Sequence, residues 1–351
     1  MGRTISRREF VGMGLVGGAG LFLGACASQT GARAGISQPG PTAVTPVKVT
    51  FGVVTDNLNH WPVYIAEEEG LFTRFGVEFD RVLTRASASS VQLLSSGSVP
   101  VATSTADAVI AGAARGGGGV VIVAGFNRAY YVLVARPQVR SYADLKGKVI
   151  GVSALRAGET PLLRALLRAR GLSEGDYQMV VAGGTPERVT AIQAGSIDAT
   201  MLTPPLDLPL VQKGFTRLGA STEVLPDFAF LTLGTNRQWA QANSEALVRV
   251  LAALTEATDW LLNPSNRDRA VQILAKRLNV SPDEARQTYE GTVAVDPPLF
   301  YRNMAVTETS LQKVLEFMVE DGTIQASEAD PRRYLDTSYL DEALRRRGVK
   351  R

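Results

Sequence analysis

The chain of 351 residues holds one histidine, His60, and one cysteine, Cys26. A Ser-His-Asp triad or a Cys-His pair would have to use that histidine, and no serine lies in the G-x-S-x-G sequence of a nucleophile elbow. The numbers of these residues also exclude a zinc site of clustered histidines and cysteines and an intramolecular disulfide. We therefore predict no catalytic residue, no metal and no other cofactor. An enzyme that uses paired carboxylates is the less favoured alternative.

Polar and aromatic side chains gather where strand-like runs end and helical runs begin. Beside parallel strands, ligands bind beyond the carboxyl ends, where helix N-termini offer unpaired N–H groups. The candidates that precede residue 131 are Asp56, Asn57, Asn59, His60, Trp61, Ser87, Ser89, Ser104, Thr105, Asn127, Arg128 and Tyr130. The later candidates are Ser153, Arg156, Gly158, Glu159, Thr160, Gly184, Thr185, Thr203 and Phe228. Together they could hold a small anion or a polar ring.

Each candidate also has a purely structural interpretation. Four hydroxyl residues are equally consistent with ordinary helix N-caps: Ser87, Ser104, Thr160 and Thr185. Arg128 and Arg156 could pair with Asp56 and Glu159 instead of a ligand. The aromatic candidates suit core packing as well as stacking. These alternatives stay open at the level of sequence.

The elements that must position these residues alternate between strand and helix. Apolar runs at 47–54, 77–83, 99–103, 119–125 and 130–135 are separated by helical stretches, among them 88–96 and 105–115. This alternation predicts an α/β fold with a mainly parallel sheet.

A second unit repeats the first. The run KVIGVS at 148–153 is similar to VTFGVV at 49–54, and each is followed by a polar loop, a proline and a helix that ends in Gly-Leu. SGSVPVATST at 96–105 matches AGSIDATMLT at 194–203 in its opening of a small residue, Gly, Ser and an apolar residue, and in its final Thr, where a strand meets the next helix. We interpret this as two lobes of like build, although helix, turn and strand in that order are common in α/β proteins. From residue 236 the pattern becomes mostly helical, with amphipathic runs at 244–263, 266–278, 281–291 and about 304–320.

The N-terminal segment has the pattern of an export signal. Residues 6–10, SRREF, resemble a twin-arginine signal, and residues 23–26, LGAC, resemble a lipobox in which Cys26 is lipidated. The uncharged stretch at 11–25 is short and rich in glycine, which disfavours a membrane span or a buried helix. We predict a signal peptide at 1–25 and a lipidated cysteine with a flexible tether at 26–46.

The charge of the chain argues against nucleic-acid binding. The formal net charge is +3, and loss of residues 1–25 would leave about +1. The clearest basic cluster, RRRGVKR at 345–351, suits a solvated tail, and phosphate tracking needs a basic face.

Several longer blocks carry a family resemblance. They are GVVTDNLNHWPVYIAEEEGLFTRFGVEF, SGSVPVATSTADAVI, YYVLVARPQVRSYADLKGKVIGVS, VVAGGTPERVTAIQAGSIDATMLTPP and NPSNRDRAVQILAKRLNVSPDEA. In their order and spacing they resemble the periplasmic substrate-binding proteins of ABC importers, in the group of sulfonate, taurine and nitrate binders and NMT1/THI5-like pyrimidine binders. The resemblance implies a type II-like, two-lobe clamshell in which each lobe is a mainly parallel sheet flanked by helices. Its two hinge crossovers, near 133–136 and 233–235, would divide the chain into lobe 1 (47–134 plus 236–351) and lobe 2 (135–235).

The resemblance also implies capture of a small molecule and its delivery to an ABC permease. The protein would be an exported monomer on the periplasmic or outer side, held to the membrane by the lipid on Cys26. A sulfonate-like or taurine-like anion is favoured as ligand because of Arg128, Arg156 and the helix N-termini. The alternatives are an aromatic metabolite held by Trp61, Tyr130, Tyr131, Phe228 and Phe230, or a role as a ligand-sensing module.

Overall fold

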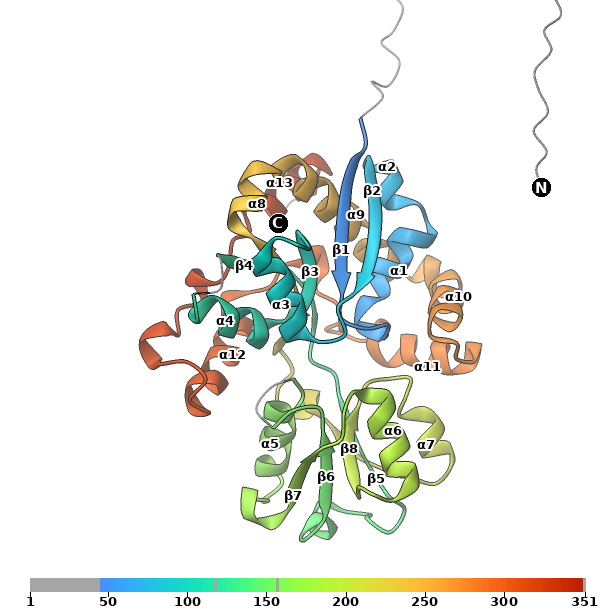
Figure 1. Ribbon diagram of the computed structural model, residues 1–351. Coiled ribbons are helices and arrows are strands. Elements are labelled where there is room, and N and C mark those ends of the chain that lie inside the picture. Colours follow the sequence, from blue (N-terminus) through green and yellow to red (C-terminus); the bar gives the residue numbers. More distant parts are fainter. Residues whose placement is uncertain (1–44, 117–118, 156–157, 350–351) are drawn as a thin grey trace, which may run out of the picture. The chain divides into compact units, whose positions relative to one another are not determined.

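The computed structural model describes residues 45–116, 119–155 and 158–349. Within these ranges the chain forms two five-stranded sheets, and helices pack beside both (Figure 1). The predicted α/β class is confirmed. None of the helices in the described ranges is both long and apolar enough to cross a membrane.

The first sheet has the strand order β2-β1-β3-β10-β4. Its strands are β1 (Val47–Val53), β2 (Val77–Leu83), β3 (Val101–Thr105), β4 (Val120–Arg128) and β10 (Ala229–Asn236). β1 is parallel to β2 and β3, whereas β10 runs antiparallel to β3 and β4. Every residue of β10 is buried, as expected for a central strand covered on both faces.

The second sheet repeats this arrangement in the order β7-β6-β8-β5-β9. Its strands are β5 (Val132–Ala135), β6 (Val149–Val152), β7 (Gln178–Val181), β8 (Ala199–Leu202) and β9 (Thr216–Ala220). Here β5 is the antiparallel strand, between β8 and β9. β10 and β5 therefore occupy the same, fourth position in the first and second sheet. Each is the first strand that the chain forms after it leaves the other sheet.

The chain passes between the sheets at 129–131 and again at 221–228. Residues 133–136 and 233–235, where the sequence suggested the crossovers, overlap β5 and β10. The division into two lobes with hinges at those positions stays a prediction.

Helices connect the strands within each sheet. Those associated with the first sheet are α1 (Trp61–Glu68), α2 (Leu71–Arg74), α3 (Ser87–Ser96) and α4 (Ala106–Ala114). Those of the second are α5 (Thr160–Ala169), α6 (Thr185–Ala194) and α7 (Leu208–Gln212). α3, α4, α5 and α6 each follow a strand, so their N-termini lie at the carboxyl edges of the sheets.

The remaining helices follow β10 and complete the first unit. They are α8 (Arg237–Ala242), α9 (Ser244–Leu262), α10 (Arg267–Leu278), α11 (Pro282–Thr292), α12 (Glu308–Glu320) and α13 (Ser338–Arg346). α9 contacts α1, α2 and α13 through a largely buried face. Ser281 caps α11 by accepting a hydrogen bond from the Glu284 N–H, and Pro282 occupies the first helical position.

Candidate functional site

Two buried amides meet at the carboxyl edge of the first sheet. After β1, the Asn57 side chain accepts a hydrogen bond from the Asn59 N–H at 2.9 Å and begins the short 3₁₀ helix Leu58–His60. This turn directs Asn59 toward β4, where its Oδ1 accepts from Nδ2 of Asn127 at 2.6 Å. Asn59 and Asn127 are 3% and 0% exposed. Oδ1 of Asn127 has no hydrogen-bond partner, so this buried acceptor is free to receive a donor.

His60 lies beside this amide pair and is held by the sheet. Its Nε2 lies 2.9 Å from Oγ1 of Thr103 on β3, and both residues are buried. Burial lowers the pKa of His60 to about 3, so the imidazole is neutral at pH 7.

Hydroxyl residues connect α3 with the start of α4. Ser104 donates to the Ser87 carbonyl at 3.2 Å, and the Thr105 N–H donates to Oγ of Ser87 at 3.3 Å. Ser89, also a candidate, lies half-buried on α3. The structure brings these hydroxyl residues together at one edge.

The carboxyl edge of the second sheet holds a buried ion pair. Glu159 accepts from the Ser153 N–H at 2.7 Å and from Oγ of Ser153 at 2.6 Å. Its carboxylate lies 3.3 Å from the guanidinium of Arg188 on α6. Arg188 also donates to the carbonyls of Gly183 at 2.8 Å and Met201 at 3.1 Å. Glu159 and Arg188 are 2% and 1% exposed, so each stabilises the other against burial.

The other candidates of this edge surround the ion pair. Thr185 lies 3.5 Å from an Nη of Arg188, and Gly184 precedes it as the N-cap of α6. Thr160 donates to the Ala154 carbonyl at the start of α5. Thr203, after β8, is buried with an unpartnered Oγ1.

One hydrogen bond connects the edges of the two sheets. The Gly158 N–H, before α5, donates to Oδ2 of Asp107 in the first turn of α4 at 3.3 Å. Burial raises the pKa of the Asp107 carboxyl. Tyr131, between the sheets, lies close enough to Asp107, Glu159 and Arg188 for all three to affect its pKa, which burial raises. Residues from both edges therefore form one continuous polar region.

The hydroxyl residues proposed as alternative N-caps do not occupy cap positions. The N-caps of α3, α4, α5 and α6 are Ala86, Thr105, Glu159 and Gly184, and none of them makes a side-chain cap hydrogen bond. The N-cap interpretation of Ser87, Ser104, Thr160 and Thr185 is wrong. The N-termini of α3, α5 and α6 thus reach these edges without a side-chain cap hydrogen bond, which favours a ligand that accepts hydrogen bonds, whereas the Asp107 carboxylate accepts from the first turn of α4.

Arg128 is committed to other parts of the protein. Its Nε donates to Asp227 at 3.0 Å and an Nη donates to the Pro298 carbonyl at 3.0 Å. The guanidinium also lies 4.4 Å from the centre of the Tyr301 ring. The suggested partner Asp56 pairs instead with Arg81. Arg156 and Cys26 lie outside the described residues.

The aromatic candidates have protein partners. Trp61 is fully buried, donates from Nε1 to the Ala270 carbonyl at 3.1 Å and packs edge-on against Tyr289. The hydroxyl of Tyr130 accepts from Arg217 at 3.1 Å. These contacts are those of packing residues.

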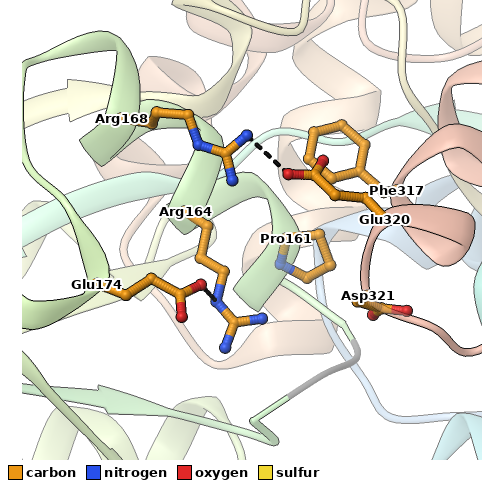
Figure 2. Close-up of a pocket in the computed structure, with 7 residues that line it drawn as sticks. All are labelled: Pro161, Arg164, Arg168, Glu174, Phe317, Glu320 and Asp321. Carbon is orange, nitrogen blue, oxygen red and sulfur yellow. Dashed lines mark ion pairs between the residues drawn. The ribbon is translucent and has the colours of Figure 1, made fainter.

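A cavity of about 260 Å³ lies between α5 and α12, outside the candidate set (Figure 2). It is lined by Pro161, Arg164, Arg168, Glu174, Phe317, Glu320 and Asp321. Arg168 and Glu320 form an ion pair of 2.8 Å, and Arg164 pairs with Glu174 at 3.0 Å. Phe317 packs edge-on against the predicted site residue Phe228, with ring centres 5.8 Å apart. The cavity therefore borders the candidate region, and its arginines already have acidic partners.

Sequence reasoning missed Asp107 and Arg188. Both lie inside helices, two and four residues after the N-caps Thr105 and Gly184. The available signal was a charged residue in or beside the first helical turn after a strand. In the described ranges, no group of three or more His, Cys, Asp or Glu residues is placed to hold a metal ion.

Residues 57–267 match the family described as NMT1/THI5 like. The chain belongs to this family. A Brucella abortus (strain 2308) protein is 31% identical to this NMT1/THI5-like chain over 242 residues, which cover 67% of the chain and 72% of the relative. The nitrate/nitrite binding protein NrtA of Synechococcus elongatus is 25% identical over 331 residues, with 82% and 74% covered. The formylaminopyrimidine-binding protein of Halalkalibacterium halodurans is 26% identical over 226 residues, with 62% and 66% covered.

Solved structures show the fold of the NMT1/THI5-like chain. The periplasmic aliphatic sulphonate binding protein SsuA from Escherichia coli matches with a TM-score of 0.66 and 20% identity, over 86% of this chain and all of that one. The periplasmic nitrate-binding protein NrtA from Synechocystis PCC 6803 matches with a TM-score of 0.69 and 16% identity, over 86% and 89%. The predicted two-lobe periplasmic-binding-protein fold and the predicted family are confirmed.

Proposed function

We propose that the protein captures a small polar solute outside the cytoplasmic membrane and delivers it to the permease of an ABC importer. The observation that carries the proposal is the hydrogen bond between Asp107 and Gly158, because it brings the carboxyl edges of both sheets to one polar region. The named binding roles of the NMT1/THI5-like relatives support a solute-binding role.

Capture requires that the solute bind one arrangement of the two lobes better than the others. A solute that contacts Asn127 on the first sheet and Thr203 on the second favours the arrangement in which both are within reach. The permease would then recognise that arrangement. The segments 129–131 and 221–228, which join the sheets, are the candidates for the hinge.

The site favours capture over catalysis. His60 is neutral, buried and bonded to Thr103, so it is poorly suited to exchange protons with a substrate at pH 7. The acids Asp107 and Glu159 accept protein hydrogen bonds and an ion pair. A role as the ligand module of a sensor would use the same residues, and permease and ATPase genes beside this one would favour transport.

The N-terminal motifs complete the proposal. Arg7 and Arg8 would direct export, and Cys26 would carry the lipid that keeps a monomeric protein near its permease. Replacing Cys26 by serine should release the exported protein into the soluble fraction of fractionated cells. Full retention in the membrane fraction would contradict the anchor.

Two ligand classes are candidates. The uncapped N-termini of α3, α5 and α6, together with the nitrate-binding relative, support a small anion. The free acceptor of Asn127 and the formylaminopyrimidine-binding relative support a polar nitrogen-containing ring.

Thermal unfolding with a panel of solutes tests capture. We expect one of nitrate, methanesulfonate, taurine or formylaminopyrimidine to stabilise the protein by about 2.7 kcal/mol at 100 times its Kd. Asn127→Ala should lose most of this stabilisation, measured against its own ligand-free protein. The control Arg332→Ala removes an exposed side chain that pairs with Asp330 and should keep it. Equal stabilisation of all three proteins, or stabilisation of none, would contradict the proposed function.

A further inference from the structure

Asp107 places a carboxylate where the two sheet edges meet. It is the second residue of α4, and its Oδ2 accepts the Gly158 N–H from the loop that precedes α5. A bound anion would compete for that N–H and for the N-terminus of α4, because both favour negative charge. In this protein Asp107 already supplies that charge.

Among the described residues, the ionised groups named around this contact, Asp107, Glu159 and Arg188, carry more negative than positive charge. Glu159 follows Gly158 directly and is paired with Arg188. Arg188 also donates to two backbone carbonyls, those of Gly183 and Met201, so its Nη groups are engaged. The charge of Glu159 is thus neutralised by Arg188, and Asp107 adds a second carboxylate beside this ion pair.

The other described arginine of the candidate set does not restore the balance. Arg128 is bound to Asp227 and to the Pro298 carbonyl, and it lies over Tyr301. Using it for an anion would require breaking these contacts.

The free polar atom of the first sheet edge is an acceptor. Oδ1 of Asn127 is fully buried and has no hydrogen-bond partner. Asn127 on β4 and Thr105 on β3 are both paired with Leu231 of β10, which lies between them. Asn127 is therefore at the same position along the strands as Thr105, the residue that precedes α4. A buried acceptor without a partner is best satisfied by a ligand that donates.

We propose that Asp107 is the residue that selects the charge of the ligand: it favours an uncharged or cationic solute with N–H donors and disfavours oxyanions. This inference rests on the proposed function and names the ligand class of the same site. The solute would donate to the carboxylate of Asp107 and to Oδ1 of Asn127. An oxyanion would meet the carboxylate, and the described arginines of the region, Arg128 and Arg188, are already engaged by protein groups.

Isothermal titration of the purified mature chain tests the inference, with formylaminopyrimidine as the donor probe and methanesulfonate and nitrate as oxyanion probes. We expect the wild type to bind formylaminopyrimidine at least 100-fold more tightly than either oxyanion. Asp107→Asn should weaken that binding at least tenfold and tighten methanesulfonate binding at least tenfold. The matched control is Asp283→Asn, which changes an exposed aspartate at the same position of α11 and should behave as the wild type.

The outcomes separate the two proposals. If the wild type binds an oxyanion and Asp107→Asn changes nothing, capture holds and the role of Asp107 is overturned. Unaltered formylaminopyrimidine affinity in Asp107→Asn overturns it as well. If no probe binds any of the three proteins, both the ligand class and the proposed function are contradicted.

Discussion

His60 illustrates how position decides the chemistry of a residue. It follows β1 at the sheet edge, as expected for a site residue, but it is 1% exposed and its Nε2 is bonded to Thr103. The unfolded chain would give this imidazole a pKa of about 6.5. Burial lowers the pKa in the folded state to about 3, so folding favours the neutral ring.

This shift predicts a pH dependence of stability. Because the folded-state pKa lies below the unfolded one, the contribution is complete above about pH 6.5 and is lost as pH falls toward 3. Between pH 8 and pH 5 the wild type should lose about 2 kcal/mol more unfolding free energy than His60→Gln. Denaturant unfolding of both proteins across this pH range measures the difference. Parallel stability curves would show that His60 is accessible to protons in the folded state.

At the residue scale, sequence reasoning found side chains that follow strands and missed those that depend on distant partners. Asn59 and Asn127 were predicted separately, and their contact across 68 residues is visible only in the fold. Arg128 was assigned to a ligand, whereas its partner Asp227 lies 99 residues away. No local pattern carries that information.

Among the elements, strand and helix bounds were predictable and strand order was not. The runs at 47–54 and 77–83 became β1 and β2 with nearly the same ends, because apolar and polar residues alternate along much of each run, as in strands with one face toward the core. The insertion of β10 between β3 and β4 follows from tertiary packing. No local sequence pattern predicted that the chain returns to the first sheet. That expectation came from the resemblance to known binding proteins.

The repeated glycines of β1 and β6 have a packing reason. A Cβ on Gly52 would lie 2.8 Å from Cβ of Ala102 and 3.0 Å from Cγ2 of Thr84, and one on Gly151 would lie 2.4 Å from Cδ1 of Ile197. Gly52 is paired with Ala102 in the sheet. The match between VTFGVV and KVIGVS thus reflects a shared close approach at β1 and β6, which occupy the second position of their sheets.

Gly52→Ala should destabilise the protein by about 1–3 kcal/mol, since the added methyl group overpacks a buried strand. Gly175→Ala is the matched control, because a Cβ there has no neighbour within 4 Å. Its free energy of unfolding should change by less than about 0.5 kcal/mol. Denaturant unfolding of both variants compares them, and equal effects would contradict the packing argument.

The protein as a whole combines a duplicated sheet plan with one polar region. The two strand orders correspond position by position, and the hydrogen bond between Asp107 and Gly158 connects the edges at which helix N-termini gather. Family membership and fold agree with the prediction from sequence. The lobe boundaries, the lipid on Cys26 and the contacting residues are proposals.

Hydrogen exchange with and without solute tests the central claim, binding by both edges at once. The panel member that raises thermal stability most should be used at saturation. Amides at 56–60 and 104–107 on the first sheet, and at 158–160 and 183–188 on the second, should exchange at least about tenfold more slowly. Residues 338–346 of α13, which packs against α9 and carries no candidate residue, provide the internal reference and should not change. Protection of one edge alone, or of neither, would contradict capture between the two sheets.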